Sequence, residues 1–177
     1  KQGSKRDVRG LQDGQPVPGG RAVFDDPDET DTQRRYKLIY YRASYYLAFS
    51  ADGVHWRRAQ PEPVWPNGAG DGLEETSFFM RDGHLGRYRG YMRVWRRHQT
   101  IRKTSLGESE DLIDWTGPKI IWEAHPDYGT GSQIYGMNVH VDAGLYWAFP
   151  WIFYTDEPLE PDLRQTMRLK LAWRRNG

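Results

Sequence analysis

Apolar residues along the chain fall in short runs, several of them alternating with polar residues, and Gly, Pro, Asn or Asp separates most of these runs from the next. Runs of this length that are rich in Tyr, Val, Ile and Phe are typical of β-strands joined by turns. The expected strands are 34–41, 45–50, 77–80, 87–95, 101–108, 134–141 and 145–153. No stretch shows a convincing amphipathic helical period. The pattern therefore predicts an all-β chain.

One hairpin of this pattern is repeated. The two copies share a serine, an aspartate and a tryptophan at identical spacing: Ser50, Asp52 and Trp56 in the first, and Ser109, Asp111 and Trp115 in the second. A third copy begins near the end of the chain, where residues 171–177 match residues 47–53 in kind. A period of about 60 residues with strand-like content suits one four-stranded blade of a β-propeller.

The repeat also bears on domain organisation. Propellers typically need about four to eight blades to close around their axis, and this chain holds roughly three at the observed period. We therefore expect a partial β-propeller domain at 21–177, preceded by an irregular segment, rich in Gly and Pro, at 1–20. The alternative is an intact small domain whose C-terminus falls within the repeat by coincidence.

The repeated turn has a structural explanation. Ser and Asp side chains can accept hydrogen bonds from backbone N–H groups two residues further on, and Gly53 can adopt a positive φ without steric cost. The following Trp is expected to pack over the hairpin. We therefore assign Asp52 and Asp111 to the scaffold and not to chemistry.

Composition narrows the function classes. The 25 Lys and Arg residues nearly cancel the 24 Asp and Glu residues, so no overall charge favours nucleic acid or a membrane surface. The chain has no Cys, and its five His residues lack the spacing of metal ligands. It also lacks a glycine-rich phosphate loop and a nucleophile elbow. We therefore expect no cofactor and no metal, while localisation and oligomeric state stay open.

The strongest local charge feature is a basic cluster interleaved with Trp95. It consists of Arg93, Arg96, Arg97, His98, Arg102 and Lys103. A solvated hairpin loop is the usual explanation for such a cluster, and the acidic stretch 108–114 could neutralise it. The alternatives are contact with phosphate or a base face, or with an anionic sugar such as a uronate or a sulfated glycan.

Three segments carry a resemblance to a known family. Residues 23–27 read Val-Phe-Asp-Asp-Pro, residues 74–79 read Glu-Glu-Thr-Ser-Phe-Phe, and residues 134–139 read Ile-Tyr-Gly-Met-Asn-Val. In this order they resemble the Arg-Asp-Pro, Glu-Cys-Pro-Asp-Leu-Phe and Phe-Tyr-Ala-x-Gln motifs of the five-bladed β-propeller glycoside hydrolases. The likeness is to family 32 (invertases and levanases) and to family 43. It covers most of 23–177 and implies about three of five four-stranded blades.

The resemblance implies a catalytic pair. Glu75 corresponds to the family's acid/base, with Glu74 as its rival, and Asp26 corresponds to an Asp that stabilises the transition state. Glycoside hydrolysis usually needs two carboxyl groups that flank one bond. We expect both acids to precede the opening strand of a blade, so that they face one axial pocket. The alternative for Asp26 is that it belongs to an acidic loop that is merely exposed to solvent and has no catalytic role.

Four residues are candidates for sugar binding: Glu74, Tyr135, Asn138 and Trp151. Tyr135 would be an aromatic platform and Asn138 a hydroxyl partner, although a core Tyr and a turn Asn are equally good explanations. Trp151 follows on the next strand, where a core role is the alternative.

Departures from the family pattern bear on activity. Asp25 stands where the family has Arg, and Thr76 stands where it has Cys. The family's nucleophilic Asp has no match, and it would precede residue 1. The sequence therefore predicts a glycoside hydrolase that acts on O-glycosidic bonds of an oligo- or polysaccharide through a carboxylate pair. The alternative is a non-catalytic β-propeller that binds glycans or a protein partner.

Overall fold

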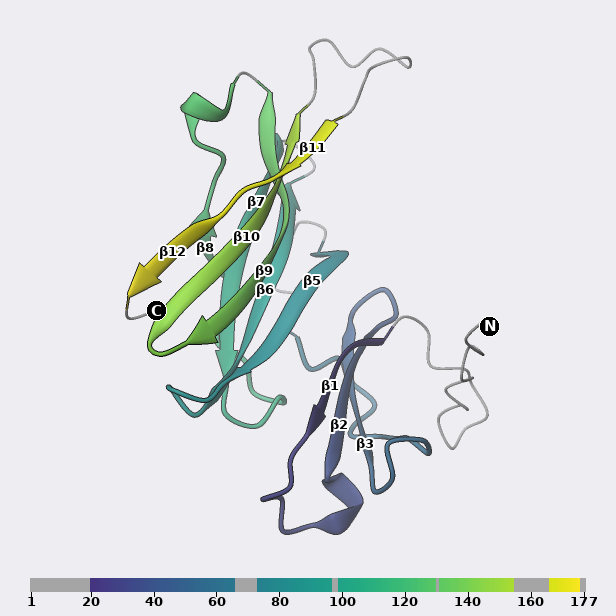
Figure 1. The fold of residues 1–177 in the computed structure, drawn as a ribbon. Coiled ribbons are helices and arrows are strands. Elements are labelled where there is room, and N and C mark those ends of the chain that lie inside the picture. The colour runs from purple at the N-terminus through teal and green to yellow at the C-terminus, as the bar shows by residue number, and fades with distance from the viewer. Residues whose placement is uncertain (1–19, 66–72, 97–98, 130, 155–165, 176–177) are drawn as a thin grey trace, which may run out of the picture. The chain divides into compact units, whose positions relative to one another are not determined.

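The computed structural model describes residues 20–65, 73–96, 99–129, 131–154 and 166–175. Within these ranges the chain forms twelve β-strands and two single-turn 3₁₀ helices, arranged in three antiparallel sheets (Figure 1). The chain divides into two compact units, residues 1–65 and 66–177. The first unit holds one sheet and the second unit holds two.

The sheet of the first unit has four strands in chain order. They are β1 (Gly20–Asp25), β2 (Tyr36–Tyr41), β3 (Tyr45–Ser50) and β4 (Arg57–Arg58), with the 3₁₀ helix η1 (Thr32–Arg34) between β1 and β2. Leu38, Tyr40, Ala48 and Trp56 form a buried apolar cluster on this sheet. The order β1-β2-β3-β4 is that of a propeller blade.

The second unit begins with a sheet of the same order. Its strands are β5 (Leu73–Asp82), β6 (Arg87–Arg96), β7 (Gln99–Ser109) and β8 (Lys119–Trp122). Trp115 follows β7 and forms a bridge with Ser109. Trp56 follows β3 at the same point of the first sheet, so the two Trp residues of the repeat occupy equivalent places in their own sheets.

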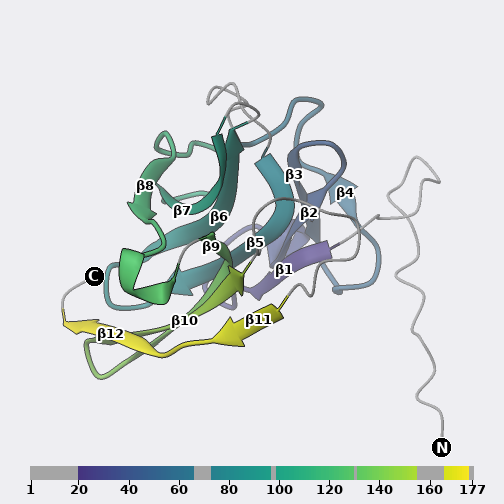
Figure 2. The same cartoon turned by 90° about the horizontal axis from the view of Figure 1, so that it is seen from above.

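The third sheet follows the 3₁₀ helix η2 (Pro126–Tyr128). Its strands are β9 (Ser132–Asp142), β10 (Leu145–Tyr154), β11 (Thr166–Leu169) and β12 (Ala172–Arg175). One edge of β10 pairs with β9. The other edge pairs with β12 beside its first half and with β11 beside its second half, so β11 and β12 lie end to end (Figure 2). β12 lies within the third copy of the repeat. Together with β11 it occupies the place of the third strand in its sheet.

Side chains from both sheets of the second unit form its core. Tyr91 on β6 packs with Met137 and Val139 on β9 and with Tyr146 on β10, and all four are buried. Burial of aromatic and aliphatic surface of this kind is the main stabilising contribution to a sheet-on-sheet contact. The core fixes how β9 lies against β5–β7, and this determines where the site residues of the unit meet.

The all-β prediction is confirmed, and every expected strand is present. The structure adds β1, β4, β8 and β11, which the pattern did not predict, and it begins β2 at Tyr36 because residues 32–34 form η1. Among the described residues there is no helix that could cross a membrane. Of the expected N-terminal segment 1–20, residues 1–19 lie outside the described ranges and Gly20 belongs to β1. That 21–177 is a single propeller domain stays a proposal, because the chain divides into two units.

Candidate functional site

The turn after β3 is closed by the side chains of Ser50 and Asp52. Ser50 Oγ accepts hydrogen bonds from the backbone N–H groups of Asp52 and Gly53 at 3.2 and 2.9 Å. Asp52 Oδ1 accepts hydrogen bonds from the N–H groups of Val54 and His55 at 2.9 and 2.8 Å. These hydrogen bonds and a side-chain contact with His55 hold the pKa of Asp52 well below its usual range.

The turn after β7 repeats this geometry. Ser109 Oγ accepts from the N–H groups of Asp111 and Leu112 at 3.3 and 2.9 Å. Asp111 Oδ1 accepts from those of Ile113 and Asp114 at 2.8 and 2.9 Å. Leu112 has a φ of 69°, where the first copy has Gly53 with a φ of 74°. Both aspartates therefore act on the backbone of their own turn, as the sequence predicted.

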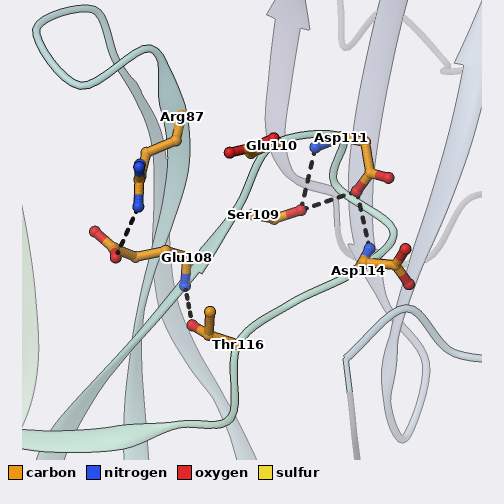
Figure 3. Close-up of a pocket in the computed structure, with 7 residues that line it drawn as sticks. All are labelled: Arg87, Glu108, Ser109, Glu110, Asp111, Asp114 and Thr116. Carbon is orange, nitrogen blue, oxygen red and sulfur yellow. Dashed lines mark hydrogen bonds and ion pairs between the residues drawn. The ribbon is translucent and has the colours of Figure 1, made fainter.

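A pocket of about 340 Å³ adjoins the second turn (Figure 3). Arg87 and Glu108 form an ion pair at 3.5 Å on one side, and Thr116 Oγ1 accepts the Glu108 N–H at 2.8 Å. Ser109 and Asp111 on the other side are used by the turn. The side chains of Arg87, Glu108, Ser109, Asp111 and Thr116 in this pocket thus already serve the scaffold, so we do not consider it the functional site.

Asp82, the last residue of β5, joins the two sheets of the second unit. Tyr146 Oη of β10 donates a hydrogen bond of 2.6 Å to its Oδ2, and the N–H groups of His84 and Leu85 donate to Oδ1 at 3.0 and 3.1 Å. Arg89 of β6 lies 3.5 Å away. Burial alone would raise the pKa of Asp82, but these donors and the Arg89 charge outweigh it and lower the pKa.

Asp26 occupies a similar place in the first sheet. It follows the last residue of β1, and Lys37 of β2 donates a hydrogen bond of 2.6 Å to its Oδ2. Asp82 likewise ends the first strand of its sheet and pairs with Arg89, a basic residue of the second strand. The expectation that Asp26 precedes an opening strand was wrong, because β1, which is short and partly polar, comes before it. Its geometry matches that of a scaffolding carboxylate.

Glu75 lies at the other end of a first strand. Leu73 of β5 pairs with Val94 of β6 and Ser77 pairs with Met92, so the segment 74–76 forms a bulge opposite Arg93. The side chains of 73–76, and so those of Glu74 and Glu75, lie outside the described part of the structure. Their backbone lies about one inter-strand spacing, roughly 4.8 Å, from β6. Bulges commonly stand beside active sites, where they redirect a side chain.

Tyr135 is the extra residue of a second bulge. Ile134 of β9 pairs with Ile152 and Gly136 pairs with Trp151, which leaves Tyr135 unpaired in the ladder. The Arg93 guanidinium lies 4.2 Å from the centroid of the Tyr135 ring. The bulge of β9 thus lies at the same end of the unit as the bulge that carries Glu75.

Arg102 of β7 completes this cluster. Its guanidinium lies 5.7 Å from the centroid of the Tyr135 ring and 5.5 Å from that of Phe153. Its Nη1 donates a hydrogen bond of 2.8 Å to Gln133 Oε1. We call Arg93, Arg102, Gln133 and Tyr135 the arginine–tyrosine cluster. Sequence analysis identified both arginines and the tyrosine, but it could not predict that one ring brings them together, because β6 and β9 are distant in sequence.

The other expected sugar-binding residues lie elsewhere. Asn138 is exposed and stands between Met137 and Val139, which are buried against β6, so it projects from the opposite face of β9. The structure therefore does not place Asn138 and Tyr135 on the same wall of a sugar-binding pocket. Trp151 is half-buried on β10, opposite Gly136. Among the described residues, no group of three or more His, Cys, Asp or Glu could hold a metal ion.

Comparison with known proteins identifies the fold. No protein-family model matches the sequence, and no curated protein matches it. Solved structures do match. A structure described as a glycoside hydrolase is 15% identical with a TM-score of 0.57, over 90% of this chain and 51% of that one. The chain has the β-propeller fold of such enzymes.

Two further structures extend this likeness. An N-acetylgalactosamine deacetylase from F. plautii, in complex with blood group B trisaccharide, is 14% identical with a TM-score of 0.54, over 92% of this chain and 52% of that one. An exo-β-1,3-galactanase from Phanerochaete chrysosporium is 10% identical with a TM-score of 0.52, over 82% of this chain and 37% of that one. The chain spans about half of the length of the first two structures. The likeness to these structures is in the fold alone, and this fold is the β-propeller that the repeat predicted.

Proposed function

We propose that the chain is part of an enzyme that cleaves O-glycosidic bonds of an oligo- or polysaccharide, with Glu75 as the proton donor. The observation that supports this role is the bulge at the start of β5, which sets Glu75 beside Arg93 at the end of the unit where the arginine–tyrosine cluster lies. The carbohydrate-active neighbours in fold support the reaction class.

The chemistry requires a carboxyl group that is protonated when the substrate binds. Burial or a neighbouring carboxylate can raise the pKa of a Glu far enough for this purpose. A second carboxylate is also needed. Asp26 was the expected partner, but its ion pair with Lys37 favours a structural role, so the proposal depends on Glu75 alone.

Replacement of Glu75 by Gln in the full-length protein tests this role. Glu75→Gln keeps the side-chain shape but removes the proton donor, so kcat should fall by roughly 100-fold or more, and most for substrates with poor leaving groups. Hydrolysis of aryl glycosides with leaving groups of graded pKa measures this. Glu74→Gln is the matched control and should lose much less. Equal rates for Glu75→Gln and the unchanged protein would show that the donor is another residue.

A non-catalytic propeller that binds glycans is the second candidate. The departures from the family motifs at Asp25 and Thr76, and the scaffolding geometry of Asp26, favour it. Calorimetric titration with oligosaccharides, followed by chromatography of the sugars, separates the two candidates. Saturable binding with no released sugar after long incubation would establish the binding protein, whereas release that depends on Glu75 would establish the enzyme.

A further inference from the structure

A second pocket, of about 320 Å³, is lined by side chains from both sheets of the second unit. Four of its lining residues belong to the buried core: Tyr91, Met137, Val139 and Tyr146. Its charged lining residues are Arg89, which is paired with Glu108, and the exposed Arg174. The volume is near the lower end of the usual range for small-ligand pockets, about 300–1,000 Å³, so the pocket suits a single apolar ring.

The repeat relates the third sheet to the first, residue by residue. Ala48 of β3 and Ala172 of β12 hold the same position in the aligned copies of the repeat. Ala48 pairs with Leu38 of β2, and Ala172 pairs with Ala148 of β10. Paired residues of neighbouring antiparallel strands lie on the same face of a sheet. The face of the third sheet that carries Ala148 and Ala172 is therefore the counterpart of the face that carries Leu38 and Ala48.

In the first sheet this face holds the tryptophan of the repeat. Trp56 is 2% exposed and packs on Leu38 and Ala48, with Tyr36 at the edge of the same cluster. Burial of so large an aromatic side chain is a major contribution to the stability of a small sheet.

The second sheet uses its corresponding face in the same way. Gly107 of β7 is the counterpart of Ala48, since both stand two residues before the serine of their copy, and Gly107 pairs with Gly90. Gly90 pairs in turn with Phe79 of β5. The ring centroid of Phe79 lies 5.7 Å from that of Trp115, in an edge-to-face arrangement.

The third sheet turns this face towards the pocket. Ala148 pairs with both Val139 and Ala172, and all three residues line the pocket. Tyr146, the counterpart of Tyr36, lines it as well. On the third strand each of the three sheets has Ala or Gly at this place, which leaves room for a ring above the backbone. The pocket is thus bounded by the surface on which the other two sheets pack an indole ring.

We propose that this pocket binds the side chain of a tryptophan, presented by a peptide segment in the register of the third copy. Gly177 is the counterpart of Gly53, and Trp56 stands three residues after Gly53, so the third residue after Gly177 has the matching register. The lining favours an indole over a sugar, because it contains no carboxylate or carboxamide that could bind hydroxyl groups. Such a site would support the fold and take no part in hydrolysis.

An extension of the 177-residue chain tests this site. Residues 54–59, Val-His-Trp-Arg-Arg-Ala, are appended after Gly177, and the matched control carries the same extension with Ala in place of Trp. The Tm of the Trp extension should exceed that of the Ala extension by about 4 °C or more, because burial of a whole indole stabilises a chain of this size by several degrees. Far-UV circular dichroism at low protein concentration measures both Tm values.

A variant that fills the pocket shows whether the gain depends on it. Ala172→Leu places a larger side chain where the ring would pack, so it should reduce the difference in Tm between the two extensions to less than about 1 °C. Ala51→Leu, at an exposed position in the turn of the first sheet, is the control and should leave the difference unchanged. Comparison of the four Ala172 and Ala172→Leu proteins isolates the contact between the ring and the pocket.

Photo-cross-linking locates the side chain directly and does not require Ala172→Leu to fold. A benzophenone amino acid replaces the appended Trp, and mass spectrometry identifies the residues to which it is linked after irradiation. We expect links within the same chain to Met137 or Ile121, which both line the pocket.

Three results would each contradict the proposal. They are equal Tm values for the Trp and Ala extensions, a difference in Tm that a folded Ala172→Leu protein retains, and cross-links confined to residues outside the pocket or to another copy of the chain. A neutral galactan oligosaccharide distinguishes the remaining occupant. If it raises the Tm of the unextended chain, and Ala172→Leu removes this effect, the pocket binds a sugar and the proposal is wrong.

Discussion

Asp82 is a single residue through which the stability of the second unit should depend on pH. Its folded pKa lies below the usual value, because the donors from Tyr146, Leu85 and His84 and the charge of Arg89 outweigh the effect of burial. A carboxyl group with a lowered folded pKa stabilises the folded state fully above its unfolded pKa, about 3.9, and this contribution is lost as pH falls through the folded pKa.

Asp82→Asn should therefore lower the stability of the protein at pH 7 and reduce its sensitivity to acid. Thermal denaturation followed at intervals from pH 7 to pH 2 measures both effects. Asp142→Asn is the control, because Asp142 also ends the first strand of its sheet but is exposed. If both variants lose stability in parallel with the unchanged protein below about pH 4, Asp82 is not the group that titrates.

Tyr146 provides the opposite pH dependence. Burial and its hydrogen bond to Asp82 raise its pKa to about 12. Since the folded pKa lies above the unfolded value of about 10, the contribution of Tyr146 is complete below pH 10 and is lost as pH rises further. Tyr146→Phe should lower the free energy of unfolding by about 1.5–3 kcal/mol, the usual value for a hydrogen bond to a charged group. Urea denaturation at pH 7 measures this, and a change below about 0.5 kcal/mol would contradict it.

Whether a residue's role could be predicted depended on how far away its partners are. The Ser50 and Ser109 turns were predicted because every partner lies within a few residues. The Asp82–Tyr146 hydrogen bond joins residues 64 positions apart, and only the packing of two sheets brings them together. The ion pair of Asp26 with Lys37 was not predicted, because β1 was not recognised as a strand.

At the level of elements, the long strands were predictable and the short strands at sheet edges were not. β6, β7, β9 and β10 each have ten or more residues, with apolar side chains that the core buries. β4 has two residues and β11 has four, all exposed in β11, so their pattern carries no alternation to detect. Pairing with a neighbouring strand, and not local sequence, makes these segments extended.

The Trp of the repeat should stabilise its blade. Trp56 is 2% exposed and packs on Leu38, Tyr40 and Ala48. Trp56→Ala should lower the free energy of unfolding by about 3–5 kcal/mol, because it removes a large buried side chain and leaves a cavity. Chemical denaturation measures the change. Val54→Ala, at a 48% exposed position of the same turn, is the control and should have little effect. Equal losses for both variants would show that Trp56 does not anchor the hairpin.

For the molecule as a whole, the outer strands of the third sheet expose apolar side chains. Leu169, Leu171 and Trp173 are 63%, 60% and 66% exposed, on or between β11 and β12. Exposed apolar residues on an unpaired sheet edge favour association with another protein surface. These side chains are therefore available for association with another protein surface.

The 177-residue chain should consequently bind a hydrophobic dye and self-associate at micromolar concentration. Leu171→Lys should reduce both, whereas Leu85→Lys, at a 40% exposed position in the turn after β5, should not. Sedimentation velocity and dye fluorescence provide the measurements. A monomer that binds no dye at any concentration would show that the exposed side chains are accommodated without a partner.

The bulges at 74–76 of β5 and at Tyr135 of β9 lie at one end of the second unit, and the Asp82–Tyr146 hydrogen bond lies towards the other. An extra residue within a bulge is absorbed locally, so the inward and outward alternation of the paired residues beyond it stays in place. The end with the bulges can therefore gain or lose a residue while the core keeps its register. Evolution could in this way change the backbone around Glu75 and Tyr135 without changing the register of the core that supports it.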